Sequence, residues 1–370
     1  MIDTSQAAKS ILRVTEDLIR IHSTADRTDE LYHAIQYVAD YFSDLPELVI
    51  HRYESNNKPS IVISFEETLE PQVMLVGHVD AVPAPDELFE PRYESGRLYA
   101  RGACDMKSEV AVMMTLMRDF YSASPRPSLA LMLTSDEEIN GNNGARYLLH
   151  DIGYRAKVAL VPDGGAEPSR IILKSKGVLH LHIGVRGRAA HGSRPWLGKN
   201  AIEDLYALYE QIKTLFPPTD DPEHWHSTCI VGTISGGVAT NQIPDFAECG
   251  IDIRFTEEHA LVDILSKIRA FAPDADIEIL SKGHPMFTSR SNQFVMLYEE
   301  AVRTLFNVPE LQEEITHGAT DGRFFAEFGI PVIVSRPVSD DQHSPNEWLD
   351  LASLEDFKRL YERAITLFLR

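Results

Sequence analysis

The chain has 370 residues, of which 44% are hydrophobic and 25% are charged, a composition typical of a globular protein. Its 35 Lys and Arg residues against 56 Asp and Glu residues give a formal net charge of −21. This acidic excess argues against nucleic acid as a partner, because phosphate backbones are bound by clustered Lys and Arg. The three cysteines are too few and too scattered for a disulfide framework.

The N-terminal residues 1–23 carry charges among their apolar positions, which is typical of an amphipathic helix rather than of a signal peptide. No apolar stretch approaches the roughly 18–20 residues that span a bilayer. We therefore expect no membrane interaction and a cytoplasmic location.

The first part of the chain, residues 1–175, alternates between helical and strand-like patterns. Helical periodicity covers residues 5–22 and 29–44, and a further helix is predicted after Asp105. Uniformly apolar runs, which indicate strands buried on both faces of a sheet, cover residues 60–65, 72–79, 128–135 and 156–162. With one more helix predicted around 141–150, this alternation indicates an α/β layered domain.

The pattern changes near residue 175. Residues 177–191 alternate apolar and polar positions, as a half-exposed antiparallel strand does. Helices predicted at 198–215 and 257–272 lie among further alternating segments, which indicates a small α+β domain.

The α/β pattern then returns, with a helix at 292–306, a strand at 329–335 and a helix at 351–369. We therefore predict a main domain formed by residues 1–175 and 285–370, and split by an inserted domain at 176–284.

Side chains that can bind metal lie at the ends of several predicted strands. They are His78, Asp80, Asp105, Glu137, Glu138, Asp163 and His343. Ligands of an open α/β sheet bind outside the carboxyl ends of its strands, so these side chains are expected to meet at one edge. Histidine and carboxylate ligands suit zinc, and also cobalt or manganese. So many acids exceed the needs of one metal ion, whereas two ions about 3.5–4 Å apart can share a carboxylate.

Each of these residues also has an ordinary explanation when it is taken alone. Asp105 stands before a helix and is by default an N-cap, and His343 beside Ser344 and Pro345 suits a turn. Their common position at strand ends is what favours a two-metal site.

Eight motifs then occur in a telling order. They are GHVDAVP (77–83), GRLYARGACDMKS (96–108), SDEEING (135–141), RGRAAHGSRPWLGKNAI (186–202), NQIP (241–244), DIR (252–254), GATDGRFF (318–325) and HSPNE (343–347). In this order they resemble the dinuclear zinc amidohydrolase and peptidase family of aminoacylase, acetylornithine deacetylase, succinyl-diaminopimelate desuccinylase and carboxypeptidase G. The resemblance covers almost the whole chain. It implies a zinc-peptidase-like three-layer catalytic domain with an inserted α+β domain that serves as a lid and in dimerisation.

The resemblance implies two bound Zn²⁺ ions, for which Co²⁺ or Mn²⁺ can substitute. His78, Asp105 and Asp163 would hold one ion. The other would be held by Asp105, Glu138 and His343, with Asp105 as the bridge between the two.

The same resemblance gives two further acids roles beside the metal ions. Asp80 would orient His78, as metal-bound imidazoles usually require. Glu137 would be the general base toward the attacking water. A base that also bound metal would lose its free lone pairs, which explains a pair of neighbouring glutamates.

In the inserted domain, His191 matches a family histidine that stabilises the oxyanion, often from the partner subunit, so we expect a homodimer through this domain. Asn241 and Arg254 match substrate-binding positions there. Arg254 could instead pair with a neighbouring acid.

A second group of matches lies later in the chain. Gly318, Ala319 and Thr320 match a loop that contacts the substrate, although Gly318 could also be only a turn residue.

Two departures from the family pattern bear on the substrate. Asp163 stands where the acetylornithine deacetylase and desuccinylase branches have glutamate, and resembles the dipeptidase or tripeptidase branches. The segment KSKGVLH (174–180) lacks the arginine and serine with which desuccinylases read succinyl. These departures argue against a true desuccinylase.

We therefore expect a zinc hydrolase that cleaves an amide bond of a small substrate with a free carboxylate. An N-acyl-amino-acid deacylase resembling acetylornithine deacetylase comes first, and a dipeptidase or carboxypeptidase of the family is the alternative. A decayed relative that only binds metabolites is the alternative from another class, but it should lack a ligand or the base, and all are present. A metal-independent hydrolase would need Cys104 as a thiolate held by a nearby base.

Overall fold

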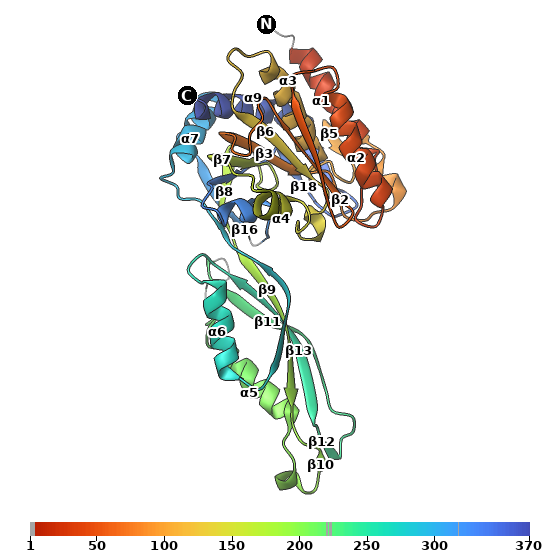
Figure 1. Cartoon of the computed structure of the whole chain (residues 1–370), viewed down its shortest axis with the longest axis vertical. Coiled ribbons are helices and arrows are strands. Elements are labelled where there is room, and N and C mark those ends of the chain that lie inside the picture. The colour runs from red at the N-terminus through yellow and green to blue at the C-terminus, as the bar shows by residue number, and fades with distance from the viewer. Residues whose placement is uncertain (1–3, 220, 222–223, 317) are drawn as a thin grey trace. The chain divides into compact units, whose positions relative to one another are not determined.

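The computed structural model describes residues 4–219, 221, 224–316 and 318–370, which form two compact units. The larger unit is built from the chain up to Lys174, from Phe287–Thr316, and from Thr320 onward. The smaller unit is built from Ser175–Met286 with Gly318 and Ala319. The chain thus leaves the larger unit, forms the smaller one and returns (Figure 1). No helix in the described part of the chain is long and apolar enough to cross a membrane.

A nine-stranded sheet forms the centre of the larger unit, with strand order β1-β2-β6-β3-β7-β17-β8-β15 and with β16 paired to β8. The strands are β1 (Val49–Ser55), β2 (Lys58–Ser64), β3 (Val73–His78), β6 (Leu129–Thr134), β7 (Val158–Val161), β8 (Arg170–Ser175), β15 (Met286–Phe287), β16 (Gln312–Thr316) and β17 (Val332–Val334). Strands β6, β3, β7 and β17 run parallel to one another, so their carboxyl ends meet at one edge of the sheet.

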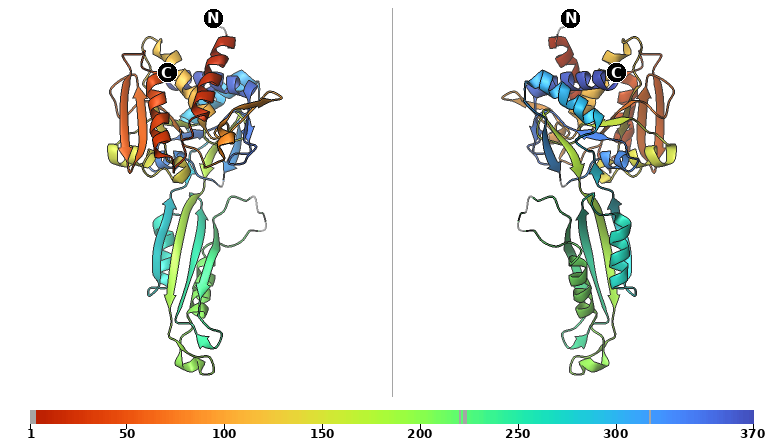
Figure 2. Two further views of the ribbon diagram at one scale, coloured as in Figure 1. Left: turned by 90° about the vertical axis from the view of Figure 1, so that its right-hand side faces the viewer. Right: turned by 90° about the vertical axis from the view of Figure 1, so that its left-hand side faces the viewer.

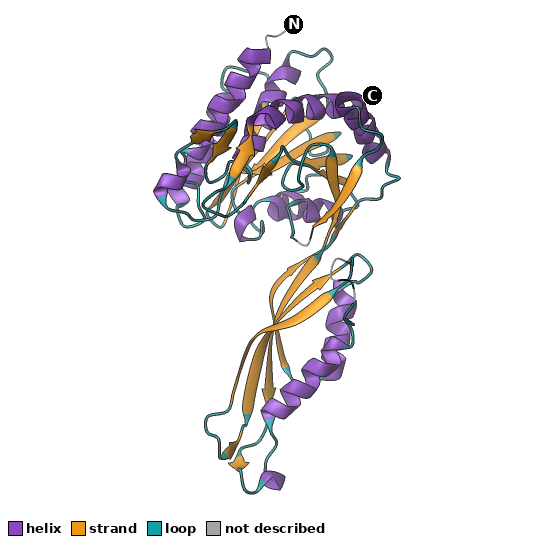
Figure 3. Ribbon diagram, turned by 180° about the vertical axis from the view of Figure 1, so that it is seen from behind, coloured by secondary structure: helices purple, strands orange, loops and turns teal. Residues whose placement is uncertain are grey.

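The central strands β3, β6 and β7 are buried along their whole length. Their uniformly apolar sequences predicted this, because a strand covered on both faces has no side that meets water. Helices lie on both faces of the sheet, as Figure 3 shows, and the α/β prediction is confirmed. The helices are α1 (Thr4–Ile19), α2 (Thr28–Tyr41), α3 (Lys107–Tyr121), α4 (Ala145–Tyr147), α7 (Gln293–Phe306), α8 (Gly322–Ala326) and α9 (Leu351–Phe368).

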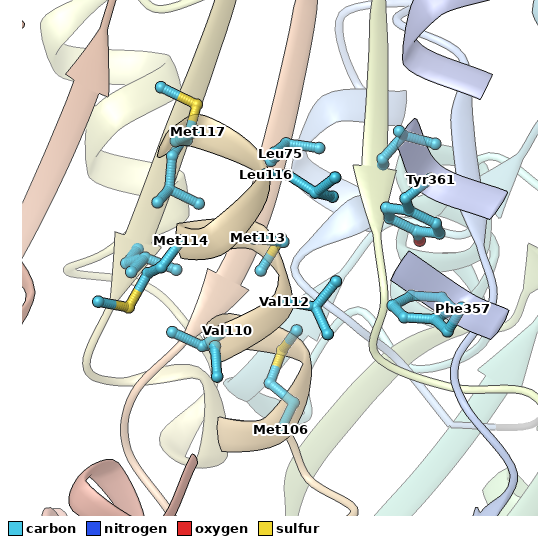
Figure 4. Close-up of a cluster of buried hydrophobic side chains, with 14 of the residues drawn as sticks. Leu75, Met106, Val110, Val112, Met113, Met114, Leu116, Met117, Phe357 and Tyr361 are labelled. Carbon is cyan, nitrogen blue, oxygen red and sulfur yellow. The ribbon is translucent and has the colours of Figure 1, made fainter. Parts of the chain in front are cut away.

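The core of the larger unit joins α3 to the sheet and to α9. Figure 4 shows apolar side chains of α3, among them Met113 and Leu116, gathered with Phe357 and Tyr361 of α9. All four of these side chains are fully buried. This packing fixes the N-terminal end of α3, which is separated from Asp105 by Met106 alone.

A second, small sheet of the larger unit connects two segments that are far apart in the sequence. Its order is β18-β19-β5-β4, formed by β18 (Ser339–Asp340), β19 (Trp348–Asp350), β5 (Arg97–Tyr99) and β4 (Arg92–Glu94). Trp348 pairs with Tyr99 in the antiparallel β19–β5 ladder. The chain before β19, which holds His343, therefore runs beside the chain after β5, which leads to Asp105.

The smaller unit is a four-stranded antiparallel sheet with two helices along one face (Figure 2). Its strand order is β11-β13-β9-β14, formed by β11 (Thr228–Gly236), β13 (Phe246–Phe255), β9 (Gly177–Arg186) and β14 (Asp276–Gly283). Its helices are α5 (Ala201–Lys213) and α6 (Leu261–Phe271), and a two-stranded ribbon pairs β10 (Ala190–His191) with β12 (Gln242–Ile243). Strand β13 alternates buried and more exposed residues because only one face carries helices.

The helix predicted around 141–150 begins only at Ala145 in the structure. Ala145–Tyr147 is α-helical, and the helix continues with a wider turn at Leu148–Ile152. The preceding backbone instead wraps around Asp136, whose side chain accepts a hydrogen bond from the Asn143 N–H at 2.7 Å. A buried acid that takes up these N–H groups competes with helix formation.

Candidate metal centre

The predicted metal ligands of the larger unit come from loops at one edge of its sheet. His78 is the last residue of β3, Glu138 follows β6, and Asp163 follows β7. These strands are parallel neighbours in the sheet, which explains why three separate segments meet. Asp105 and His343 reach the same place through the small β19–β5 sheet.

Two groups of ligand atoms meet at Asp105. One group joins His78, Asp105 and Asp163, and the other joins Asp105, Glu138 and His343, with the ligand atoms of each group within 4.8 Å of one another. Asp105 Oδ1 lies 3.1 Å from His78 Nε2, and Asp105 Oδ2 lies 3.1 Å from His343 Nε2. Each oxygen of one carboxylate thus faces a different imidazole, which is the arrangement a bridging ligand requires.

Asp105 does not cap the helix that follows it. Helix α3 begins after Met106, and no side chain caps its N-terminus. The ordinary explanation of an aspartate before a helix therefore does not apply, and the carboxylate serves the two histidines instead.

The ligand atoms of the second group are arranged so that a cation could bind between them. His343 Nε2 also lies 3.2 Å from Glu138 Oε2, and Glu138 Oε1 is buried with no hydrogen-bond partner within the described residues. A buried carboxylate oxygen without a donor is costly unless an ion or water satisfies it. The donors, imidazole nitrogens and carboxylate oxygens, are those that zinc and related divalent metals prefer. The residues present therefore fit a pair of metal ions.

The electrostatics of these residues indicate a place for positive charge. Hydrogen bonds with Asp105 and Glu138 raise the pKa of His343 to about 10. Burial acts to lower the pKa of His78, but contacts with Asp105 and Asp80 outweigh it and raise that pKa well above its usual value. Burial and the nearby Asp105 carboxylate raise the pKa of Asp163 to about 7. Metal ions would supply the charge that protons supply here.

Asp80 is buried beside His78, and its carboxylate contacts more than one group. Its Oδ1 lies 3.4 Å from His78 Nδ1, and the His78 nitrogen also lies 3.0 Å from the Asp80 carbonyl oxygen. The same carboxylate accepts hydrogen bonds from the backbone N–H of Glu137 at 3.3 Å and of Glu138 at 3.1 Å. It therefore connects a ligand with the two-glutamate loop.

Glu137 differs from its neighbour Glu138, because it belongs to neither ligand group found among the described residues. Burial, and next the Asp163 carboxylate, raise the pKa of Glu137 well above its usual value. A carboxyl group with a raised pKa that binds no metal is suited to accept and return a proton.

The sequence alone did not indicate a role for three charged residues near the metal centre, Arg101, Arg336 and Glu347. The Arg336 guanidinium donates from Nε to the Gly165 carbonyl at 2.6 Å and from Nη1 to Gln342 Oε1 at 2.8 Å, which links the Asp163 and His343 loops. Arg101 and Glu347 form a buried ion pair beside Asp105 and His343. Both of these lie in motifs that the sequence shows, GRLYARGACDMKS and HSPNE, but their partners lie too far away in sequence to be found there.

Cys104 does not provide a nucleophile. Burial raises the pKa of its thiol far above the usual value, so the thiolate that metal-independent hydrolysis would require is absent at neutral pH.

In the smaller unit, the structure places His191 and Asn241 side by side. His191 on β10 pairs with Gln242 on β12, and the Gly192 N–H donates to the Asn241 carbonyl at 2.7 Å. His191 is exposed and lines a hollow of about 520 Å³ with Ser193, Arg194 and Leu197. His191 Nδ1 lies 2.8 Å from Ser193 Oγ and accepts the Ser193 backbone N–H at 3.2 Å, so Nδ1 acts as an acceptor and the proton of the neutral imidazole is on Nε2.

The structure does not bring Arg254 to the same place. Arg254 on β13 pairs with Val178, at the end of the sheet where the chain enters the smaller unit. His191 lies beyond the other end, where Phe246 pairs with Arg186. At about 3.3 Å per residue, the strand from 246 to 254 alone spans roughly 26 Å. Arg254 also forms a two-point ion pair with Asp252, with N–O distances of 2.9 and 3.2 Å.

The remaining predicted substrate contacts, Gly318, Ala319 and Thr320, lie in a loop. Thr320 is buried, and its hydroxyl oxygen accepts a hydrogen bond from the Gly322 N–H at 3.1 Å, at the start of α8. Gly318 is exposed.

Comparisons with known proteins agree with this fold. Residues 74–367 match the peptidase family M20/M25/M40. A succinyl-diaminopimelate desuccinylase from Alkalilimnicola ehrlichii is 30% identical over 322 residues, which cover 79% of this chain and 82% of that protein. The crystal structure of aminopeptidase PepT from Bacillus cereus has a TM-score of 0.77 at 17% identity and covers 98% of this chain and 99% of that one.

A third comparison gives the same fold. The Bacillus subtilis protein YXEP, described as a dinuclear metal-binding peptidase from family M20, has a TM-score of 0.64 at 15% identity over 99% of both chains. The family match and the clustered ligands together define a metal-dependent hydrolase. The chain belongs to the peptidase family M20/M25/M40.

Proposed function

We propose that this protein is a two-zinc hydrolase that removes the acyl group from an N-acylated amino acid. The observation that carries this proposal is that Asp105 belongs to both ligand groups, while Glu137 stands beside them and, among the described residues, belongs to neither. Two bound zinc ions would lower the pKa of a water molecule and polarise the amide carbonyl. His78, Asp105 and Asp163 would hold one ion, and Asp105, Glu138 and His343 the other.

The chain's own residues then move the proton. Glu137 takes a proton from the attacking water and returns it to the nitrogen of the departing amino acid, as a general base and then a general acid. Burial and the Asp163 carboxylate raise its pKa, and a carboxyl with a raised pKa is a stronger base toward water and returns the proton less readily to bulk water than to the departing nitrogen. Asp80 keeps Glu137 in place through the backbone hydrogen bond at 3.3 Å.

His191 is proposed to stabilise the negative oxygen that develops during attack. The Ser193 N–H occupies Nδ1, so the exposed Nε2 carries the proton that such an oxygen needs. Asn241, held beside His191 by the Gly192 hydrogen bond, would contact the same end of the substrate.

The distance along the sheet of the smaller unit supports a homodimer. His191 and Arg254 lie at opposite ends of a sheet roughly 26 Å long, so one substrate cannot touch both within a single copy of this unit. A second copy could bring its His191 to the substrate of the first. The smaller unit also exposes Tyr206, Ile234 and Val238, by 64%, 67% and 86%, and β11 is an edge strand. Exposed apolar side chains beside a free strand edge favour pairing with another copy. Light scattering should give twice the chain mass for the unaltered protein and the mass of one chain for Ile234→Lys. A monomeric mass for the unaltered protein would contradict the dimer.

The substrate's free carboxylate is proposed to bind Arg254. A guanidinium has five N–H donors, and the pair with Asp252 uses only two nitrogens, so donors remain for a carboxylate. The loop of Gly318, Ala319 and Thr320 would contact the rest of the substrate. We place this reaction in the cytoplasm, where the three unpaired cysteines would remain reduced.

Two observations bear on the choice between deacylation and peptide hydrolysis. The curated relatives are named desuccinylases, and desuccinylation removes an acyl group, which favours deacylation. Aspartate at position 163 favours the alternative, a dipeptidase or carboxypeptidase.

The deciding experiment is a panel of N-acetyl and N-succinyl amino acids, dipeptides and C-terminal peptide substrates, tested with the zinc-loaded protein. We expect kcat/KM for the preferred N-acyl amino acid to exceed that for any dipeptide by about tenfold or more. A preference for dipeptides would support the alternative. Two bound zinc ions with no hydrolysis of any substrate would show a decayed enzyme.

A further inference from the structure

Glu347 is a buried acid that holds the backbone around Asp105. Its side chain is only 1% exposed. Its Oε1 accepts hydrogen bonds from three backbone N–H groups, those of Gly102 at 2.8 Å, Cys104 at 2.9 Å and Asp105 at 3.2 Å. Successive N–H groups that point at one anion form a nest, so the loop that carries Asp105 is wrapped around this carboxylate.

Arg101 connects the same carboxylate to the His343 loop. Its side chain is 4% exposed, and Nη1 donates to Glu347 Oε2. Its Nη2 donates to the main-chain oxygen of His343 at 2.9 Å. One guanidinium therefore binds the side chain that organises the Asp105 loop and the backbone of the His343 loop, and its planar shape fixes the direction of both bonds.

The small sheet explains how residues 246 positions apart meet. Trp348 pairs with Tyr99 across β19 and β5, and the Ala100 N–H donates to the Glu347 carbonyl at 3.2 Å. Beyond this last hydrogen bond, the segment after β5 continues to Asp105, and the segment before β19 comes from His343. The pair of Arg101 and Glu347 stands where the two loops diverge.

A buried ion pair of this kind is a poor source of stability alone, because removing both charges from water costs about as much as their attraction returns. Its effect here is geometric. It fixes the backbone of the two loops that carry Asp105 and His343. Asp105 Oδ2 and His343 Nε2 lie 3.1 Å apart. These atoms belong to the ligand group that also contains Glu138.

We infer that Arg101 and Glu347 form a positioning clamp that sets the separation of Asp105 and His343 and thereby the affinity of the metal ion bound between Asp105, Glu138 and His343. Neither residue belongs to a ligand group found among the described residues. The inference rests on the two-metal site of the proposed function, but its test needs no substrate.

The test is Glu347→Gln, which keeps the size of the side chain and removes its charge. The metal-free protein is titrated with Zn²⁺ in a calorimeter. We expect two zinc ions to bind the unaltered protein, and one of the two to bind Glu347→Gln about 10- to 100-fold less tightly, the range typical of residues that orient metal ligands. The visible spectrum of the Co²⁺-loaded variant should also change, because the ligands around one ion have moved.

The matched control is Asp119→Asn, which makes the same carboxylate-to-amide change in the ion pair with Lys358 on α9. It should leave both zinc affinities and the Co²⁺ spectrum unchanged. If Glu347→Gln binds both ions within about twofold of the unaltered protein, within the error of such comparisons, the clamp is contradicted even if its melting temperature falls. An unaltered protein that binds fewer than two ions would contradict the two-metal site instead.

Arg101→Lys provides a milder variant in case Glu347→Gln does not fold. It keeps the positive charge but loses the planar fork that serves Glu347 and the His343 carbonyl together. We expect a smaller loss of affinity for the same ion, and unchanged affinity for both ions would again contradict the clamp.

Discussion

The Asp80 carboxylate is tied to Glu137 through the backbone, with Asp80 Oδ1 accepting the Glu137 N–H at 3.3 Å. Its other oxygen accepts the Glu138 N–H at 3.1 Å, and His78 Nδ1 lies 3.4 Å from Oδ1. One buried acid therefore positions a metal ligand and the proposed base at the same time. From the sequence, Asp80 was expected to orient His78 alone.

Asp80→Asn should impair both metal binding and turnover. The amide retains one acceptor oxygen, but its NH₂ group must face either a backbone N–H or the imidazole, so at least one of the contacts is lost. We expect zinc affinity to fall about 10- to 100-fold, measured by competition with a chelator. Turnover at saturating zinc should remain below that of the unaltered protein, because the Glu137 loop is displaced. Full recovery of turnover at high zinc would show that Asp80 serves the metal ligand only.

Glu137→Ala should nearly abolish turnover while both zinc ions still bind. General base catalysis contributes about 10²- to 10⁴-fold, so kcat should fall by at least this factor. Glu138→Ala is the matched comparison, because it removes a member of a ligand group and should lower the metal content. Metal content is measured by elemental analysis after dialysis. If Glu137→Ala loses half of the metal, the roles of the two glutamates are reversed.

His191→Ala should lower kcat by about 10²- to 10³-fold, as the loss of one oxyanion donor does, and leave the metal content unchanged. Ser193→Ala is the comparison, because it removes the 2.8 Å contact between Ser193 Oγ and His191 Nδ1 but keeps the backbone N–H at 3.2 Å, so a much smaller loss of kcat is expected. Steady-state kinetics on the preferred substrate measure both. Unchanged turnover in His191→Ala would remove this residue from the mechanism.

Zinc binding should release protons and tighten as the pH rises. The raised pKa of His343, about 10, and of His78 mean that both imidazoles are protonated in the metal-free protein at pH 7. Binding must displace these two protons and part of a third from Asp163, whose pKa is about 7, and apparent affinity should rise about tenfold per pH unit for each proton displaced. Calorimetry at one pH in buffers of different ionisation enthalpy counts them, and no proton release would contradict the protonated state.

The raised pKa of His343 affects the stability of the metal-free protein in the opposite direction. Zinc affinity rises with pH, whereas this contribution to stability falls. A folded-state pKa of about 10, above the ordinary value of 6.5, stabilises the fold fully below pH 6.5. This contribution is lost as the pH rises from 6.5 through about 10. Alkaline pH therefore weakens the metal-free fold at this site while it favours zinc.

Gly141→Ala should displace the loop that carries Glu137 and Glu138. Gly141 has a φ of +58°, and a Cβ atom there would clash with Asp321 Oδ1. Since Asp321 is buried, the loop must give way. We expect unfolding free energy to fall by more than about 1 kcal/mol, with a larger relative loss of kcat. Gly153→Ala is the control, because it has a φ of +100° but no atom within 4 Å of the added carbon. Chemical denaturation and kinetics should separate the two variants.

Much of the fold could be predicted from local pattern. The apolar runs that became β3, β6 and β7 and the periodic segments that became α7 and α9 agree with the structure within a few residues. The strands of the small sheet could not be predicted, because two or three residues are too short to show a period of two. The start of the helix predicted around 141–150 was wrong, because the buried Asp136 accepts the Asn143 N–H before the helix begins at Ala145.

The sequence by itself determined the kinds of side chain available and that they stand at the ends of buried strands, since both are local properties of the chain. Only the tertiary structure decided which of them meet. Asp105 and His343 are 238 positions apart, and the register of β19 on β5 brings them to 3.1 Å. Arg254 and His191 belong to one domain in sequence, yet the length of β13 keeps them apart. The distance between two remote residues here depends on which strands pair. The hydrophobic pattern of one segment does not indicate its partner strand.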